Sequence, residues 1–241
     1  MHKINKSPEL IIIANDMELE SNPRYTELLL GFFALRQWFV EKQRWPVTDG
    51  DKDTYDSNLN TVNLLYVDDT ITNDVANRRV ITGMRLTRLD DPTQALSATM
   101  MRGNNEMHEG ALRYLKGIDE SQTLAFDLTR LVAMDAQNRD DVSKIKQGIG
   151  EMLGAGLRSC REIRDDPSKQ IVWVYAVTAE FLKVLERMGI DQTIIAQGFA
   201  SDDDRKNNKV TYFCCTDPEK SLELLSGDSK ASEGVLSGLG E

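Results

Sequence analysis

Hydrophobic positions along the chain follow two periodicities, which predict helices and strands. In residues 25–43 the apolar side chains recur at spacings of three and four, as on an amphipathic helix. Similar spacings predict helices at 142–163 and 178–188, and residues 106–116 favour another. Alternating or short continuous apolar runs predict the strands, which we place at 9–14, 60–69, 78–89, 121–134, 170–177, 193–199 and 209–216.

The order of these elements predicts a single mixed α/β domain over residues 1–225. The run at 170–177 is nearly all apolar, which is typical of a central strand covered on both faces. Residues 226–241 are rich in Gly and Ser, so we expect a disordered tail there.

In two of the predicted strands, the alternation of side chains between the two faces determines which residues could share a site. In 78–89 it places Thr82 and Gly83 on opposite faces. In the strand at 121–134 a regular backbone would likewise place Asp127 and Arg130 on opposite faces. A bulge between these two residues would change that arrangement.

Composition and charge exclude several classes of protein. The formal net charge of −10 argues against general nucleic-acid binding, which needs a positive surface. No apolar run approaches the roughly 20 residues of a membrane span, and the run at 9–14 is too short for a signal-peptide core. We therefore expect a cytoplasmic protein without stable membrane insertion. The three cysteines and two histidines lack disulfide or metal-site spacing, so no metal is expected.

Carboxylates are concentrated in the stretch after Trp45, which contains Asp49, Asp51, Asp53 and Asp56. Their mutual repulsion is unfavourable unless they face water, a cation or a basic partner. Taken alone, such a stretch is most simply a solvated turn. Together with the arginines of later strands, we interpret it as part of a site for a positively charged small molecule.

Five segments carry a family resemblance through their order and spacing. They are L-R-Q-W-F-V-E-K-Q-R-W (35–45), D-K-D-T-Y-D (51–56), G-M-R-L-T-R-L-D-D-P (83–92), D-L-T-R-L (127–131) and V-T-A-E-F-L-K-V-L-E-R-M-G-I (177–190). Each is weak alone. In this order they resemble the motifs of the acyl-homoserine-lactone synthases, the autoinducer synthases of bacterial quorum sensing, over roughly residues 25–200.

This resemblance implies both a fold and a reaction. The fold would be a GNAT-like α-β-α sandwich around a mixed, mostly antiparallel sheet with a V-shaped splay. The enzyme would acylate the amino group of S-adenosylmethionine from an acyl thioester, close the lactone and release methylthioadenosine. S-adenosylmethionine would be a substrate, and no cofactor is implied. No covalent nucleophile is needed, which agrees with the lack of a convincing Cys/His or Ser/His set.

The resemblance also implies which residues form the site. The catalytic set is Asp51, Asp127 and Arg130, with either aspartate as the candidate base. The S-adenosylmethionine site is Arg36, Phe39, Trp45, Asp53, Asp56 and Arg85. The acyl pocket is Thr129, Tyr175 and Thr178. In this chain Arg36 precedes Phe39 by three residues where the family has four, which on a helix rotates Arg36 by about 100° from the expected face.

The acyl donor implied by the resemblance is acyl-carrier protein, with acyl-CoA as the alternative. Because acyl-carrier protein is acidic, a basic cluster is the candidate docking surface. Its members are Arg158, Arg161, Arg164 and Lys169. Taken alone, this cluster is most simply a solvated helix face. Two further hypotheses stay open at this point, a GNAT-like acyltransferase for another amine such as an amino acid, and a binding module without turnover.

Overall fold

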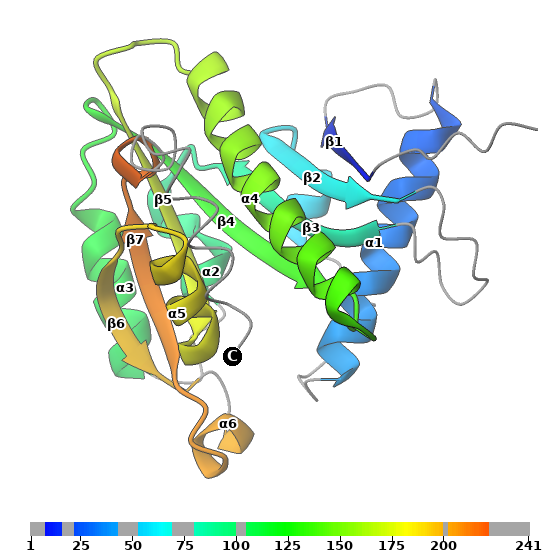
Figure 1. The fold of residues 1–241 in the computed structure, drawn as a ribbon. Coiled ribbons are helices and arrows are strands. Elements are labelled where there is room, and N and C mark those ends of the chain that lie inside the picture. The colour runs from blue at the N-terminus through cyan, green and yellow to red at the C-terminus, as the bar shows by residue number, and fades with distance from the viewer. Residues whose placement is uncertain are drawn as a thin grey trace, which may run out of the picture. The chain divides into compact units, whose positions relative to one another are not determined.

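A computed structural model describes residues 8–15, 22–42, 53–68, 80–99, 105–199 and 202–221 of the chain. Trp45, Asp49, Asp51 and the predicted tail at 226–241 lie outside these ranges. The chain divides into two compact units, and its helices and strands are labelled in Figure 1. Unit 1 is Met1–Thr87 with Arg130–Gly156, and unit 2 is Arg88–Thr129 with Leu157–Glu241. The single domain predicted over 1–225 stays a prediction.

Seven strands follow one another in the sheet order β1-β2-β3-β4-β5-β7-β6. The pairs β1–β2, β2–β3, β5–β7 and β6–β7 are antiparallel, and β4–β5 is parallel. The predicted mixed, mostly antiparallel α/β sheet is therefore confirmed. The strands are β1 Glu9–Ala14, β2 Thr61–Val67, β3 Val80–Arg88, β4 Thr123–Ala133, β5 Gln170–Thr178, β6 Thr193–Gly198 and β7 Thr211–Thr216.

Helices account for most of the remaining described residues, and the longer ones were predicted. The α-helices are α1 Pro23–Lys42, α2 Leu96–Thr99, α3 Asn105–Lys116, α4 Arg139–Glu162, α5 Ala179–Arg187 and α6 Asp202–Lys206. The 3-10 turns are η3 Thr54–Ser57 and η4 Pro92–Gln94. The short elements α2, α6, η3 and η4 were not predicted, because they are too short to show a periodicity.

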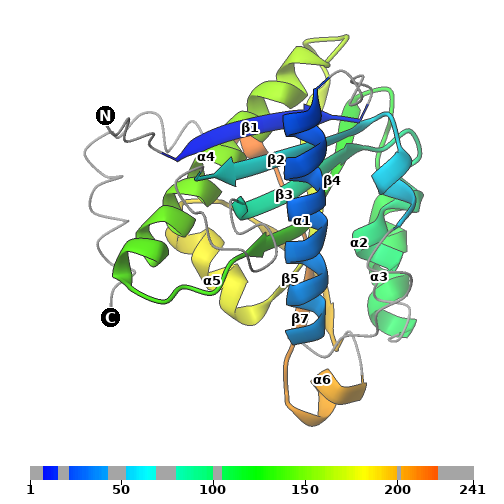
Figure 2. The ribbon, with the colours of Figure 1, turned by 90° about the vertical axis from the view of Figure 1, so that its right-hand side faces the viewer.

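Unit 1 has a helix on each face of its strands. Figure 2 shows α1 in front of β1, β2 and β3, with α4 behind them. A Cβ added at Gly83 of β3 would lie 2.6 Å from a ring carbon of Phe32 on α1. A Cβ added at Gly148 of α4 would lie 2.6 Å from the ring of Tyr66 and 2.7 Å from Thr82 Cγ2. Thr82 and Gly83 thus face opposite helices, as the alternation along β3 predicted.

Unit 2 contains the strand predicted to be central, β5, between β4 and β7. The parallel register of β4 with β5 runs from Thr123 opposite Gln170 to Asp127 opposite Val174. Both strands continue past this paired part, to Ala133 and Thr178. A register that covers only the first part of the two strands is what the predicted splay requires.

Helices cover the sheet of unit 2 as well. Gly110 of α3 packs on β6, where a Cβ on the glycine would lie 3.2 Å from the Cβ of Ala196. The C-terminal part of α4 also contacts β5, where the indole Nε1 of Trp173 donates to the Sγ of Cys160 at 3.4 Å. Both residues are fully buried, so the end of α4 is anchored on the central strand.

Within the described ranges, no helix is both long enough and apolar enough to cross a bilayer.

Candidate functional site

A short turn just before β2 presents two of the predicted aspartates. Asp53 caps η3, because its Oδ1 accepts the backbone N–H of Tyr55 at 2.9 Å. Asp56 reaches back, and its Oδ2 accepts the backbone N–H of Asp53 at 3.0 Å. This reciprocal arrangement is a capping box, formed here by an aspartate at each end. It fixes the two carboxylates next to each other.

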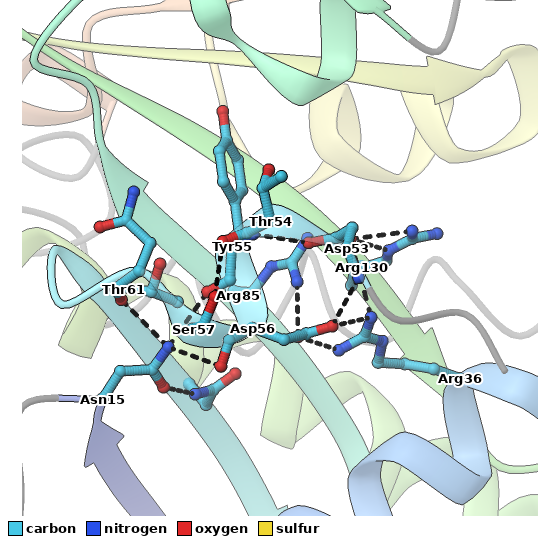
Figure 3. Close-up of polar contacts among 12 residues, drawn as sticks. Asn15, Arg36, Asp53, Thr54, Tyr55, Asp56, Ser57, Thr61, Arg85 and Arg130 are labelled. Atoms are coloured by element: carbon cyan, nitrogen blue, oxygen red, sulfur yellow. Dashed lines mark hydrogen bonds and ion pairs between the residues drawn. The ribbon is translucent and has the colours of Figure 1, made fainter. Parts of the chain in front are cut away.

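Three arginines from three elements converge on these carboxylates (Figure 3). Arg36 of α1 binds both oxygens of Asp56, with Nη1–Oδ1 at 2.7 Å and Nη2–Oδ2 at 3.1 Å. Arg85 of β3 bridges the pair, with 2.7 Å from Nη1 to Asp56 Oδ1 and 2.7 Å from Nη2 to Asp53 Oδ2. Arg130 of β4 donates to Asp53 Oδ2 from Nη2 at 3.0 Å and from Nε at 3.3 Å. These five residues form what we call the arginine–aspartate network.

The network is largely removed from water. The side chains of Arg85 and Arg36 are 0% and 1% exposed, and those of Asp53 and Asp56 are 12% and 11% exposed. Arg130 is the most accessible arginine of the network, at 14%. Charge-assisted hydrogen bonds between such groups are the strong kind, and they are strengthened by the low local dielectric.

Electrostatics keep both aspartates ionised. Burial alone would raise the pKa of Asp53, but hydrogen bonding and attraction from Arg85 and Arg130 outweigh it and hold that pKa below its ordinary value. Burial acts in the same way on Asp56, where Arg36 and Arg85 lower the pKa. The network is therefore a set of fixed charges near neutral pH.

Aromatic rings complete the surroundings of the two most buried arginines. The guanidinium carbon of Arg85 lies 5.2 Å from the centroid of the Tyr55 ring. That of Arg36 lies 5.6 Å from the Phe32 ring and 5.1 Å from the Phe33 ring. Aromatic faces attract cations, so these rings help to hold guanidinium groups that water does not reach.

Two features of the network differ from what the sequence predicts. Arg36 lies in the network, so the rotation of about 100° inferred from its spacing to Phe39 was wrong as a guide to its position. Arg130 has a φ of 58°, which is unusual for a residue other than glycine. The strand β4 is therefore irregular at Arg130, and the simple alternation between Asp127 and Arg130 does not apply.

Phe39 is the one remaining predicted residue of unit 1 that lies within the described ranges. Phe39 is partly buried and packs against the apolar core of α1, β1, β2 and β3. Trp45 and Asp51 fall outside the described residues, so their roles stay predictions.

Asp127 belongs to unit 2 and is completely buried. Its Oδ2 accepts the backbone N–H of Ser97, at the start of α2, at 3.0 Å. Ser97 is itself 1% exposed. No signal in the sequence pointed to Ser97, since its contribution comes from the backbone of a helix too short to be predicted.

The predicted acyl-pocket residues also lie in unit 2. Thr129 is buried, as is Tyr175, whose hydroxyl donates to Gln192 Oε1 at 3.0 Å. Thr178 caps α5, where its Oγ1 accepts the backbone N–H of Phe181 at 3.4 Å. Thr178 is thus the N-cap of α5, and its role in a pocket stays a prediction.

The predicted docking cluster is partly paired with acidic residues of the chain. Arg161 Nε lies 2.9 Å from Glu219 Oε1, and Arg164 Nη1 lies 3.0 Å from Glu219 Oε2. Lys169 Nζ lies 3.9 Å from Asp165. Arg158 is exposed on α4. The positive charge of the cluster is therefore reduced by carboxylates of the chain itself.

The cysteines have the environment of structural residues. Burial raises the pKa of Cys160 and that of Cys214 to about 12, and burial also raises the pKa of Cys215. Such thiols are poor nucleophiles at neutral pH. Among the residues that the structure describes, no group of three or more His, Cys, Asp or Glu side chains is placed to hold a metal ion.

Comparison with known proteins gives a likeness in structure. No protein-family model and no curated protein matches the chain. The solved structure of BjaI, a CoA-dependent acyl-homoserine lactone synthase with SAM and isopentyl-CoA, matches with a TM-score of 0.59 at 20% identity, over 91% of this chain and 88% of BjaI.

Two further solved structures match at a lower level. The CoA-dependent acyl-homoserine lactone synthase MesI has a TM-score of 0.51 at 16% identity, over 87% of this chain and 89% of MesI. The synthase LasI has a TM-score of 0.51 at 15% identity, over 88% and 91%. The chain therefore has the fold of the acyl-homoserine lactone synthases, the fold that its five sequence segments predicted.

Proposed function

We propose that this protein is an acyl-homoserine-lactone synthase, an acyltransferase that uses S-adenosylmethionine and an acyl thioester. The observation that carries the proposal is the arginine–aspartate network. Four of the five resembling segments each contribute at least one residue to this buried cluster of unit 1. The chain also has the fold of these synthases. If these charged residues formed only separate ion pairs at the surface, there would be no reason for their motifs to occur in the order found in the family.

The proposed reaction has two steps. In the first, the deprotonated amine of S-adenosylmethionine attacks the thioester carbonyl, a C–N bond forms, the C–S bond breaks, and a thiol leaves. The amine is protonated at neutral pH, so a base must first accept a proton. In the second step the carboxylate oxygen attacks the γ-carbon, and the bond from that carbon to the sulfonium breaks. Methylthioadenosine leaves as a neutral thioether.

Either Asp127 or Asp51 is the proposed base. The hydrogen bond from the Ser97 amide occupies one oxygen of Asp127 and fixes the carboxylate on β4. Complete burial and this fixed orientation make the Asp127 carboxylate a group that could accept a proton from a bound amine. The donors for the developing oxyanion would be backbone N–H groups of β5 past the part paired with β4.

The network would shape the binding site for S-adenosylmethionine. Arg36 and Arg85 are fully buried and tie the turn at Asp53 and Asp56 to α1 and β3. Arg130 is more accessible, so we assign it the orientation of the substrate carboxylate. Phe39 and Trp45 would supply aromatic surface for the sulfonium.

The nature of the acyl group follows from the proposed pocket at Thr129, Tyr175 and Thr178. By the family resemblance, Tyr175 falls where some members have a small threonine that favours 3-oxo acyl chains. Its hydroxyl is already bonded to Gln192. We therefore propose a product without a 3-oxo group.

The acyl donor is a separate part of the proposal. The family resemblance implies acyl-carrier protein, which would dock at Arg158, Arg161, Arg164 and Lys169. Glu219 already binds two of these arginines, which weakens their attraction for an acidic partner. The structures of BjaI and MesI are described as CoA-dependent synthases. Both donors therefore belong in the test.

The decisive experiment combines the purified protein with S-adenosylmethionine and matched panels of acyl-carrier-protein and acyl-CoA thioesters. We expect release of methylthioadenosine together with a lactone product, both detected by mass spectrometry. A parallel panel of amino acids as acceptors provides the contrast. Turnover with amino acids and none with S-adenosylmethionine would favour the other-amine acyltransferase, and binding without any turnover would favour the binding module.

A further inference from the structure

The side chain of Asn15, directly after β1, contacts the turn that carries the two aspartates (Figure 3). Its Nδ2 lies 3.1 Å from the carbonyl oxygen of Tyr55, 3.3 Å from that of Asp56 and 3.1 Å from that of Asn58. Carbonyl oxygens only accept hydrogen bonds, so the partners themselves fix which end of the Asn15 amide faces the turn. One amide group thus contacts three carbonyl groups of the turn and its exit.

A second asparagine fixes the first. Asn63 of β2 is 2% exposed, and its Nδ2 donates to Asn15 Oδ1 at 3.0 Å. The same Nδ2 lies 3.5 Å from the carbonyl oxygen of Ile13. Asn63 pairs with Arg85 in the register of β2 with β3, so the two side chains share a face of the sheet. The asparagine pair therefore stands on the same strands as the arginine–aspartate network.

The contacts inside the turn are all local, and they include the capping box and two backbone hydrogen bonds. Its internal backbone bonds are Asp56 N to Asp53 O at 3.1 Å and Asn58 N to Tyr55 O at 3.2 Å. A single 3-10 turn has poor hydrogen-bond geometry and is not stable by itself. The ion pairs hold its side chains, and a donor from outside the turn adds hydrogen bonds to its carbonyl groups. Asn15 is such a donor.

We propose that Asn15 is a positioning residue for the site, acting through the backbone of the turn at Tyr55–Asn58. Its amide sets where Asp53 and Asp56 meet Arg36 and Arg85. This inference rests on the proposed function as far as substrate is concerned, but the positioning itself is a property of the free protein. A site whose binding-competent form is only partly populated binds its ligand more weakly by that fraction.

The test compares Asn15→Ala with a matched control, Asn138→Ala. Asn138 Oδ1 accepts the backbone N–H of Asp141 at 3.0 Å and caps the start of α4, away from the turn. Both variants lose one structural asparagine amide. We expect Asn15→Ala to raise KM for S-adenosylmethionine about tenfold, with kcat changed by less than about twofold, because the amide that contacts the turn and accepts from Asn63 is lost. Asn138→Ala should leave KM unchanged.

A third variant separates shape from hydrogen bonding. Asn15→Asp keeps the size of the side chain and the acceptor for Asn63, but its carboxylate faces three carbonyl oxygens and donates to none of them. We expect a rise in KM at least as large as in Asn15→Ala. A KM equal to that of the unmodified protein in both variants would overturn the inference.

Amide hydrogen exchange provides the readout that needs no substrate. In Asn15→Ala we expect the amides of Asp56 and Asn58 to exchange about tenfold faster, while those of Leu64 and Leu65 in β2 keep their rates. If the unmodified protein shows no turnover with S-adenosylmethionine, the proposed function fails and the exchange decides the inference alone. Faster exchange confined to the turn would support it, and unchanged exchange would overturn it.

Discussion

Arg85 is the residue on which the arginine–aspartate network most depends. It is fully buried, and it bonds to both aspartates at 2.7 Å. We predict that Arg85→Met lowers the free energy of unfolding by about 3 kcal/mol. Removing one partner of a buried ion pair costs about 3–5 kcal/mol, because the other charge is left without its partner. The lower end applies because Asp53 keeps Arg130 and Asp56 keeps Arg36.

The matched control lies on the same strand. Arg88 is 37% exposed, and its ion pair with Asp90 at 3.2 Å is at the surface. Arg88→Met should lower the free energy of unfolding by less than about 0.5 kcal/mol. Methionine preserves most of the apolar stem in both variants, so the comparison isolates the guanidinium group.

Thermal and urea unfolding followed by circular dichroism provide the measurement. For a chain of this length about 1 kcal/mol corresponds to about 2–4 °C in Tm, so Arg85→Met should unfold about 6–12 °C earlier. If Arg85→Met and Arg88→Met unfold within about 1 kcal/mol of each other, the burial of the network does not strengthen its ion pairs and the electrostatic reasoning is refuted.

Three further predictions address protonation, catalysis and packing. The pKa of Asp53 in the folded protein is lowered, so its contribution to stability is complete above the unfolded pKa of about 3.9 and is lost as pH falls through the lowered value. We therefore expect the difference in unfolding free energy between the unmodified protein and Asp53→Asn to be constant above about pH 5. Below about pH 4 this difference should disappear, as acid titrations of unfolding would show. Asp127→Asn retains an acceptor for the Ser97 amide and should leave the free energy of unfolding within about 1 kcal/mol while reducing kcat by at least about a hundredfold; a retained kcat would move the role of base to Asp51. Gly148→Ala should lower the free energy of unfolding by about 1–2 kcal/mol in urea unfolding, although alanine favours helices, because its Cβ would lie 2.6 Å from the Tyr66 ring; a stabilised variant would show that this contact relaxes freely.

Periodicity predicted the parts of the fold that are long and regular. The helix at 25–43 became α1, Pro23–Lys42, and the apolar run at 170–177 became the central strand β5. Both were predictable because burial selects apolar residues in a regular pattern. In the helix they occur at every third or fourth position, and in the central strand at nearly every position. The helix α2 has four residues, which is too few for burial to leave such a pattern.

Sequence motifs predicted those site residues whose charged side chains occur in a characteristic order and spacing. Asp53, Asp56, Arg85 and Arg130 were named from motifs, and the structure brings them into contact. Asn15 and Ser97 were not named, since an amide that binds backbone carbonyls and a backbone N–H that binds a carboxylate leave no trace in composition. Contacts between residues 30 or more positions apart appear only when the chain is folded.

Arg130 shows how the sequence argument and the structure fit together. A regular β4 would turn Arg130 away from Asp127, yet a φ of 58° lets it reach Asp53. A left-handed conformation at a residue other than glycine costs about 1–2 kcal/mol and persists only where surrounding interactions impose it. The bonds from Arg130 to Asp53, a residue that Arg85 also binds, are such interactions. The network is therefore held within unit 1 by contacts between residues far apart in the sequence.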